Sequence, residues 1–497
     1  MTRPNILFCL ADDAGMHFGA YGCAWVHTPS FDRVAREGVL FTQAYTPNAK
    51  CAPSRACILT GRNSWQLADA ANHQSYFPPQ FKSVFEALAE AGYFVGCTAK
   101  GWAPGDPGMR DGRRRQLTGT PYNDRRCEPP TPYISACDYA GNFEDFLDDR
   151  PEDRPFCFWY GCTEPHRGYE YGSGAARGGR STSEIDHVYG IWPDTEVVRN
   201  DLLDYGYEIE HYDRHLARML DLLERRGLLD DTLVVVTSDN GMPFPRAKGQ
   251  EYYYSNHLPL AIMWRGGLRA PGRRVDDMVS FIDFAPTFLE LAGLPQADSG
   301  MAPITGRSLT DILLTDRDGR VSPDRDHVLI GKERHDLGRP GDVGYPIRGM
   351  FKDGWLYLRN FEPDRWPAGN PETGYMNADG GPTKTEILAR RGDPEEGRYW
   401  QWSFAKRPPE ELYNVAEDPD CLDNLADAPE HQPLKEAMRR QMEDELLAQE
   451  DPRMTEQGPP LDELPTASRE RRNFHQRFLS GELGPAGWIS ETDIQAE

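Results

Sequence analysis

The sequence has no long hydrophobic run. Its 497 residues contain no uninterrupted stretch of 18 apolar residues, the length that a membrane-spanning helix needs. The first apolar run, ILFCLA, is short and ends in two aspartates, so we expect a core strand there and no signal peptide. The ten cysteines contain no C-x-x-C pair, which argues against a zinc site and a dense disulfide framework. These absences exclude a membrane-spanning protein and leave the cellular location open.

Positive charge is also scarce. Lys and Arg number 55 against 79 Asp and Glu, which gives a formal net charge of −24. Because so acidic a chain repels a phosphate backbone over most of its surface, we expect no nucleic-acid partner. Aromatic residues are nevertheless abundant, at 11%, and disordered chains are poor in them. We expect a folded protein with a polar surface, and the length favours two domains or one large domain with an appendage.

Apolar runs alternate with amphipathic segments over about the first 300 residues, a pattern typical of parallel strands joined by helices. The predicted strands are Asn5–Leu10, Tyr93–Cys97, Phe156–Tyr160 and Thr232–Thr237. The predicted helices are Ser30–Glu37, Ser83–Ala91, Val197–Arg226 and Asp283–Ala292. We therefore expect an α/β sandwich with helices on both faces of the sheet.

The alternation weakens after about residue 345. Gly349–Phe361 is typical of a hairpin with its turn at Asp353–Gly354, and Pro433–Glu450 is typical of a helix. We predict a large domain over residues 1–345 and a smaller one, with antiparallel strands and a helix, over residues 346–497.

Polar side chains follow two of the predicted strands. Asp12 and Asp13 come after the first strand, and Asp239 and Asn240 come after the run TLVVVT. Sites in parallel sheets form beyond the carboxyl ends of the strands, so neighbouring strands would bring these groups together. Three carboxylates at one point require a cation, and oxygen ligands favour Ca²⁺ or Mg²⁺ over zinc. The alternative is that the four residues are helix caps and turn residues.

A second candidate site lies in the segment KCAPSRACILTG, residues 50–61. Pro53 suits the first turn of a helix that Gly61 ends, so Cys51 would lie at its positive end with Arg55 one turn on. That setting stabilises an anion, either a thiolate or a bound oxyanion. The residues alone leave three readings open: a cysteine nucleophile, an anion-binding turn and a buried thiol.

The same segment resembles the signature of the type I sulfatases, C-x-P-S-R-x-x-x-L-T-G. The opening PNILFCLADD and the later SDNG resemble the two calcium motifs of that family, in the family's order. DNGMPFPRAK and TEPHRGYE are most similar to the heparan N-sulfatase (sulfamidase) branch. The resemblance implies an alkaline-phosphatase-like sandwich whose large, mixed, mostly parallel sheet lies between helices. It also implies a smaller C-terminal α+β domain with an antiparallel sheet.

The resemblance implies a role for each matching residue. Cys51 would be the precursor of formylglycine, made by a formylglycine-generating enzyme, and its hydrated aldehyde would attack sulfur. Arg55 would stabilise it, Lys100 and Lys248 would bind the sulfate, and His166 would contact the sulfate and the leaving atom. The implied calcium ligands, with Mg²⁺ as an alternative ion, are Asp12, Asp13, Asp239, Asn240 and the modified Cys51.

One position departs from the family pattern. The family carries a histidine two residues after the lysine, where this chain has Trp102. His73, His257 and His335 are candidates to take over its role, and His335 is preferred because it follows the strand-like run HVLIG. The residues proposed to bind substrate are His73, Trp102, Glu333, Arg334 and His335.

The implied activity is hydrolysis of a carbohydrate sulfate, either an O-sulfate ester or N-sulfoglucosamine, with a role in polysaccharide degradation. One alternative is a phosphonate monoester or phosphodiester hydrolase of the same superfamily. The other is a non-catalytic glycan-binding relative, which the loss of the histidine would favour. The expected partners are the sulfated sugar and the modifying enzyme, with the chain as a monomer or homodimer. Family members are commonly periplasmic, secreted or lysosomal.

Overall fold

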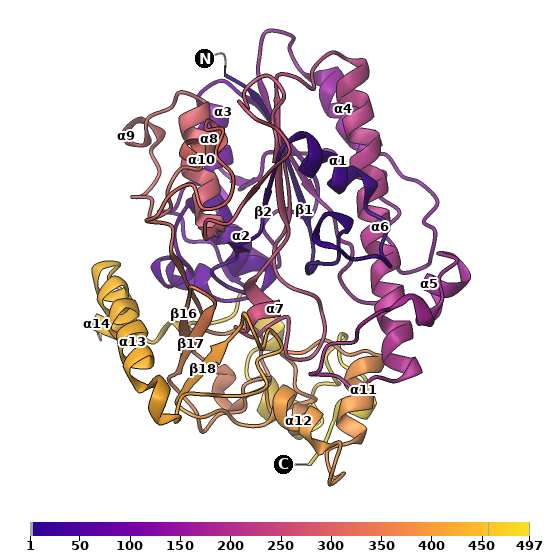
Figure 1. The fold of residues 1–497 in the computed structure, drawn as a ribbon, viewed down its shortest axis with the longest axis vertical. Coiled ribbons are helices and arrows are strands. Elements are labelled where there is room, and N and C mark those ends of the chain that lie inside the picture. Colours follow the sequence, from indigo (N-terminus) through magenta and orange to yellow (C-terminus); the bar gives the residue numbers. More distant parts are fainter. Residues whose placement is uncertain (1–2, 456, 497) are drawn as a thin grey trace.

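The computed structural model describes residues 3–455 and 457–496 (Figure 1). Its centre is an eight-stranded sheet in the order β13-β2-β12-β11-β1-β10-β5-β9. The parallel part consists of β1 (Asn5–Ala11), β5 (Phe94–Ala99), β9 (Thr120–Pro121), β10 (Phe156–Gly161) and β11 (Thr232–Ser238). The antiparallel neighbour of β11 is β12 (Leu260–Met263), which is followed by β2 (Val39–Phe41) and β13 (Arg273–Val275). The four predicted strands are therefore present, each within two residues of its expected bounds.

Helices cover both faces of this sheet. Alternate residues of β1 point to opposite faces, so Leu7 and Cys9 enter one apolar core while Ile6, Phe8 and Leu10 enter the other. The helices of the first face are α1 (Pro29–Glu37), α4 (Tyr139–Asp149) and α6 (Glu196–Arg225). Those of the second face are α2 (Cys51–Thr60), α3 (Val84–Glu90), α8 (Phe284–Leu291) and α10 (Thr310–Leu313). The four predicted helices are confirmed within one residue, and so is the sandwich.

A separate antiparallel sheet lies at the other end of the molecule (Figure 1). Its order is β15 (His327–Lys332), β16 (Ile347–Lys352), β17 (Trp355–Asn360) and β18 (Glu410–Asn414). The hairpin β16–β17 turns at Asp353–Gly354, both at positive φ, as predicted. Helix α13 (Gln432–Ala448) packs its Met438, Met442 and Leu446 against one face. β15 precedes residue 346, so this sheet begins within the first of the two predicted domains.

The remaining elements are short. Two-residue strands are β3 (Ala44–Tyr45), β4 (Ser75–Tyr76), β6 (Gly105–Asp106), β7 (Met109–Arg110), β8 (Arg113–Arg114) and β14 (Val279–Ser280). Short helices are α5 (Ser173–Ala176), α7 (Tyr253–Asn256), α9 (Gln296–Ser299), α11 (Pro382–Ala389), α12 (Gly397–Phe404), α14 (Pro452–Thr455) and α15 (Phe474–Leu479). Within the described ranges, no helix combines the length and the apolar character needed to cross a bilayer.

Candidate active site

The four polar residues after β1 and β11 converge, because these two strands are direct neighbours in register. The backbone N–H of Asp13 donates to Asp239 Oδ1 at 3.0 Å, and Asn240 Nδ2 donates to Asp13 Oδ1 at 2.8 Å. Carboxylate oxygens of Asp12, Asp13 and Asp239 all lie within 4.8 Å of one another. This convergence is what the rule for parallel strand ends predicts.

These oxygens fit a hard divalent cation. Asp12, Asp13 and Asp239 are buried, and Asn240 Oδ1 is a buried acceptor with no donor among the described residues. A buried carbonyl oxygen without a donor is costly unless something else satisfies it, and a cation would do so. The set of three carboxylates and one amide matches the preference of Ca²⁺ or Mg²⁺ for oxygen ligands.

Three cationic side chains surround the carboxylates. Arg55 Nε lies 2.8 Å from Asp239 Oδ2, and Lys100 Nζ lies 2.5 Å from Asp12 Oδ2. Lys248 Nζ bridges Asp13 Oδ2 at 2.6 Å and Asp379 Oδ2 at 2.7 Å.

These contacts set the ionisation of the carboxylates and the lysine. Burial alone would raise the pKa of Asp12, but Lys100 and Arg55 outweigh it and hold that pKa well below its usual range. Burial lowers the pKa of Lys248, yet Asp13 and Asp379 raise it well above normal, so the lysine stays charged. The site therefore holds several buried charges of both signs.

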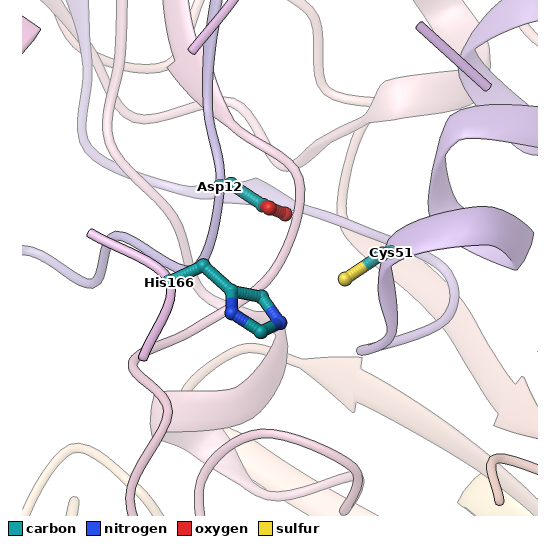
Figure 2. Close-up of side chains that lie close together, drawn as sticks. All are labelled: Asp12, Cys51 and His166. Carbon is teal, nitrogen blue, oxygen red and sulfur yellow. The ribbon is translucent and has the colours of Figure 1, made fainter. Parts of the chain in front are cut away.

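Cys51 is the first residue of α2 and faces the same cluster. Lys50 is extended and precedes the helix, and Gly61 ends it at φ 67°, as the sequence predicts. The side chains of Asp12, Cys51 and His166 point toward a common centre (Figure 2). Cys51 is only 1% exposed, and its Sγ lies 3.8 Å from Asp13 Oδ1. Burial, together with the charge of Asp12, raises the pKa of this thiol, so the unmodified cysteine is a poor nucleophile.

His166 reaches the cluster from the loop after β10. Its Nδ1 lies 2.6 Å from the carbonyl oxygen of Arg167, to which it donates, so Nε2 is free to face the cluster. Nε2 lies 3.9 Å from Asp13 Oδ2, and the side chain is 34% exposed. A side chain that meets both the buried charges and solvent can exchange a proton with a bound molecule.

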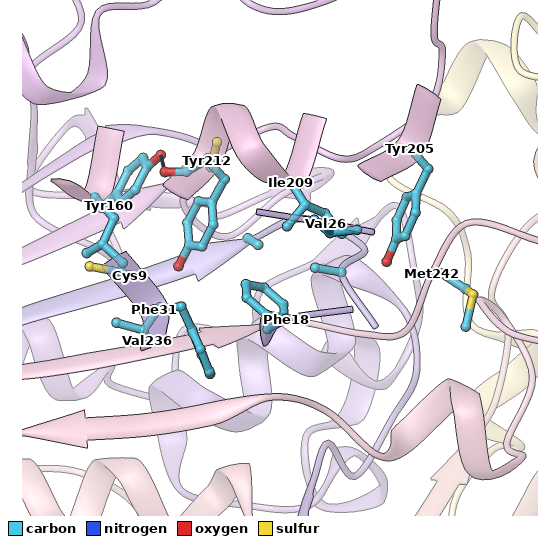
Figure 3. Close-up of a cluster of buried hydrophobic side chains, with 14 of the residues drawn as sticks. Cys9, Phe18, Val26, Phe31, Tyr160, Tyr205, Ile209, Tyr212, Val236 and Met242 are labelled. Carbon is cyan, nitrogen blue, oxygen red and sulfur yellow. Dashed lines mark hydrogen bonds between the residues drawn. The ribbon is translucent and has the colours of Figure 1, made fainter. Parts of the chain in front are cut away.

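The loops that carry the carboxylates rest on the core beneath α6 (Figure 3). Tyr205 of α6 accepts a hydrogen bond from the backbone N–H of Gly15 at 2.8 Å, two residues after Asp13. Met242, two residues after Asn240, is buried in the same core. The aromatic and aliphatic side chains of this core thereby fix both loops.

A cavity of about 440 Å³ opens above the cluster. Five predicted residues line it: Cys51, His73, Lys100, His166 and Lys248. The unpredicted lining residues are Lys50, Gln74, Ala103, Pro104, Asp336, Asp379, Ser468, Glu470, Arg471 and Trp488. Apart from Lys50, which begins the segment 50–61, no sequence motif marks these positions, since they come from loops and from the carboxyl-terminal segment. Charge balance could have suggested one feature of this wall, a carboxylate beside Lys248.

His73 is the one proposed substrate-binding residue that lines the cavity. Its Nδ1 lies 3.1 Å from Asp336 Oδ1, and Lys50 Nζ lies 2.8 Å from Asp336 Oδ2. Burial lowers the pKa of His73 to about 4, although Asp336 opposes this shift. His73 is therefore a neutral polar group on the cavity wall at neutral pH.

The other four proposed substrate-binding residues do not line the cavity. Trp102 packs edge-on against Phe77 in the apolar core, and the next two residues of the chain take its place on the wall.

Glu333, Arg334 and His335 follow β15 but turn inward. Glu333 pairs with Arg348 at 2.6 Å and with Arg453 at 2.6 Å, and Arg334 donates to backbone carbonyls near residue 464. The His335 ring is fully buried, with Nε2 2.8 Å from Asn48 Oδ1. These contacts correct the expectation that the segment faces substrate, because Arg348 and Arg453 pair with Glu333, carbonyls near residue 464 accept from Arg334, and Asn48 contacts His335.

His257, the remaining candidate to replace the family histidine, is also outside the cavity. Its Nε2 lies 2.8 Å from the carbonyl oxygen of Thr42, and its ring lies between Tyr45 and Tyr253. Among the three histidines considered, His73 is therefore the one that lines the same cavity as Cys51.

The fold is an alkaline-phosphatase-like α/β sandwich, and its candidate site places Cys51 beside a cluster of buried carboxylate oxygens. The model of the sulfatase family matches residues 4–294, and the chain belongs to that family. It is a sulfuric ester or sulfamate hydrolase.

Individual relatives are distant but cover most of the chain. It is 26% identical to human N-sulphoglucosamine sulphohydrolase over 89% of both proteins. It is 25% identical to an ulvan-active sulfatase of Formosa agariphila, over 90% of this chain and 75% of that protein.

Solved structures are similar in fold. One of them is a protein solved in complex with its substrate, D-glucosamine-2-N,6-O-disulfate. The TM-score with this chain is 0.63 at 19% identity, over 93% of this chain and 100% of that one. A phosphonate monoester hydrolase of Agrobacterium radiobacter has a TM-score of 0.59 at 18% identity, over 90% of this chain and 95% of that one. At such identities these likenesses show the fold alone.

Proposed function

We propose that this protein removes sulfate from a carbohydrate, as an O-sulfate ester or from N-sulfoglucosamine, with a formylglycine made from Cys51 as nucleophile. The observation that carries the proposal is the position of Cys51, at the start of a buried helix and among Asp12, Asp13, Lys100 and Lys248. The raised pKa of the thiol argues against a cysteine nucleophile and is consistent with a modified residue. The relatives named above act, by their names, on sulfated sugars and on ulvan.

The chain's own residues would have separate roles in the reaction. Lys100 and Lys248 would neutralise the sulfuryl oxygens as charge moves onto them, while Arg55 holds Asp12 and Asp239 in place. His166, protonated at Nε2, would donate its proton to the oxygen or nitrogen that leaves sulfur. A hydrated formylglycine would contribute the attacking hydroxyl, and the net reaction consumes one water molecule.

A calcium ion is part of the proposal. Asp12, Asp13, Asp239 and Asn240 would hold it, and it would supply a positive charge that polarises the sulfate. The donor-free Asn240 Oδ1 supports this assignment.

The test is mass spectrometry of the tryptic peptide Cys51–Arg55, which cleavage after Lys50 releases. The protein is produced together with a formylglycine-generating enzyme, and sulfate release from sulfated sugars is measured on the same sample. An aldehyde at residue 51 with sulfate release is the expected result. An unmodified thiol in active protein would overturn the formylglycine mechanism. Faster hydrolysis of a phosphonate monoester than of any sulfate would favour the alternative hydrolase, and inactivity of the aldehyde form would favour a glycan-binding role.

A further inference from the structure

The carboxyl-terminal segment, far in sequence from the oxygen cluster, contributes Ser468, Glu470, Arg471 and Trp488 to the cavity wall, and we call this part of the wall the mouth. The backbone N–H of Ala467 and the hydroxyl of Thr466 both donate to the carbonyl oxygen of Gln74, each at 2.8 Å. Trp488 is fixed from the other side, since its Nε1 donates to the carbonyl oxygen of Met376 at 2.9 Å. The segment is therefore held on both sides of the opening.

Arg471 lines this mouth with its guanidinium against the Trp488 ring, 4.9 Å from the ring centroid. The stacking pre-orients the side chain and leaves the planar edge of the guanidinium available for an oxyacid. No hydrogen bond or ion pair of the Arg471 side chain is found within the described ranges.

The other cations of the cavity wall are engaged. Lys50 pairs with Asp336, Lys100 with Asp12, and Lys248 with Asp13 and Asp379. Arg471 differs from these lysines because it rests on an aromatic ring and has no acidic partner among the described residues. In a chain with a net charge of −24, an arginine without an acid partner is a strong local attractor for an anion.

We propose that Arg471, supported by Trp488, binds a second anionic oxyacid group of the substrate, a sulfate or a uronate carboxylate, while the inner lysines hold the sulfate that is removed. This inference rests on the proposed function, because it places a sulfated sugar in the cavity. It deepens that function by naming polyanionic sugars as the preferred class. Trp488 is a positioning residue, and Arg471 is the residue that sets specificity.

Two neighbours provide matched variants. Arg469, two residues earlier, is exposed and does not line the cavity, so Arg469→Gln removes an equal charge outside the proposed subsite. Glu470 lines the mouth, is exposed and carries the opposite charge. Glu470→Gln therefore removes a negative charge from the mouth, whereas Arg471→Gln removes a positive one.

The experiment measures binding to Cys51→Ala protein by titration calorimetry, so it needs no formylglycine. The probes are D-glucosamine N-sulfate, D-glucosamine 2-N,6-O-disulfate, and N-sulfoglucosamine linked to an uronic acid. At least one dianionic probe is expected to bind about tenfold more tightly than the monoanion, since hydrogen bonds between charged groups contribute about this much. Arg471→Gln in this background should abolish that advantage and leave the affinity for the monoanion unchanged. Arg469→Gln should keep the advantage, and Glu470→Gln should keep or increase it.

The outcomes separate the two proposals. Whichever probe loses its advantage in Arg471→Gln identifies the second group as sulfate or carboxylate. If Arg471→Gln weakens all probes equally or none of them, the subsite is wrong while sugar-sulfate binding stands. If no probe binds, while the same protein hydrolyses a phosphonate ester when Cys51 is intact, the proposed function fails and the subsite fails with it.

Discussion

Lys248 occupies an unusual place for a single residue, since its ammonium group bridges two buried carboxylates of different loops. Asp13 belongs to the first strand end, whereas Asp379 comes from a loop 366 residues later. We expect Lys248→Met to lower kcat/KM for a sulfate ester by about 100-fold or more, because a preorganised charge facing the sulfate would be lost. The measurement is initial-rate kinetics on 4-nitrophenyl sulfate.

The matched control for Lys248 is Lys82→Met, since Lys82 pairs with Glu90 on the surface and lies outside the cavity. Thermal unfolding of both variants shows whether the fold is kept. Unchanged kcat/KM in a folded Lys248→Met protein would contradict the role given to this lysine.

The oxygen cluster also predicts a response to calcium. Because the cluster exists only in the folded chain, Ca²⁺ added after treatment with EDTA should raise Tm. At a Ca²⁺ concentration of 100 times Kd, the gain in unfolding free energy is about 2.7 kcal/mol. Asp239→Asn should reduce the shift, since one of the three carboxylates loses its charge. Calorimetric scans with and without Ca²⁺ measure it, and an equal shift in the variant would argue that the ion binds elsewhere.

Single residues also show which contacts can be predicted from the sequence and which cannot. Asp12, Asp239 and their neighbours could be placed together because adjacent parallel strands end at one edge. Glu333 could not be placed, because its position after a strand says nothing about Arg348 on the neighbouring strand, which draws it inward. The partners of Lys50 and Lys248 were missed for the same reason, since tertiary packing alone selects them.

At the level of elements, α2 carries Cys51 at one end and is terminated by Gly61 at the other. A Cβ on Gly61 would lie 2.8 Å from Ile304 and 3.1 Å from Ala285, and the residue has φ 67°. We expect Gly61→Ala to destabilise the protein by about 1–3 kcal/mol through this strain. Urea unfolding measures the loss, and Gly227→Ala, also at positive φ but with open space around it, isolates the steric part. Equal losses of unfolding free energy in the two variants would show that the positive φ accounts for the effect and that the contacts with Ile304 and Ala285 do not.

A second element contact, between β15 and α13, should make stability depend on pH. Burial lowers the pKa of His327, but Glu445 and Asp326 outweigh it and raise that pKa above 6.5. A raised folded pKa stabilises the protein below the unfolded pKa, and this contribution is lost as pH rises through the folded pKa. His327→Gln should therefore lower the free energy of unfolding more at pH 6 than at pH 9. Denaturant titrations at both pH values measure this, and equal losses would contradict it.

Element prediction succeeded where a periodic pattern was strong. The run TLVVVT and the amphipathic stretch that became α6 gave bounds within one residue. The two-residue strands and four-residue helices carry too few residues for any period to be recognised. Tertiary contacts decide their conformation.

At the scale of the whole molecule, a buried ion pair attaches the carboxyl-terminal segment to α11. Lys384 Nζ and Asp493 Oδ2 form a fully buried ion pair at 3.1 Å. We expect Asp493→Asn to destabilise the protein by about 3 kcal/mol, because the lysine would keep an uncompensated buried charge. Denaturant unfolding is the measurement. Glu491→Gln on the exposed side of the same turn is the control, and similar stabilities of the two variants would contradict the prediction.

This long-range closure is the part of the architecture that the sequence did not reveal. The predicted sandwich and the hairpin follow from local patterns. The return of residues 466–493 to the cavity beside Cys51 depends instead on a small apolar cluster, in which Phe474 and Ile489 pack on Leu337 and Met376. Such contacts between distant segments produce no periodic pattern in the sequence, so they cannot be predicted from it.

The burial of α2 has a consequence for biosynthesis. Because every residue of this helix is buried and Cys51 is almost wholly covered, a second enzyme has no access to the thiol once folding is complete. If Cys51 is converted as proposed, conversion has to occur on the nascent or unfolded chain. At about 5–20 residues per second, translation of each further hundred residues takes roughly 5–20 s, and during this time the modifying enzyme competes with folding. The fraction of active protein would then depend on how quickly the central sheet forms, and adding the modifying enzyme to folded protein would not increase it.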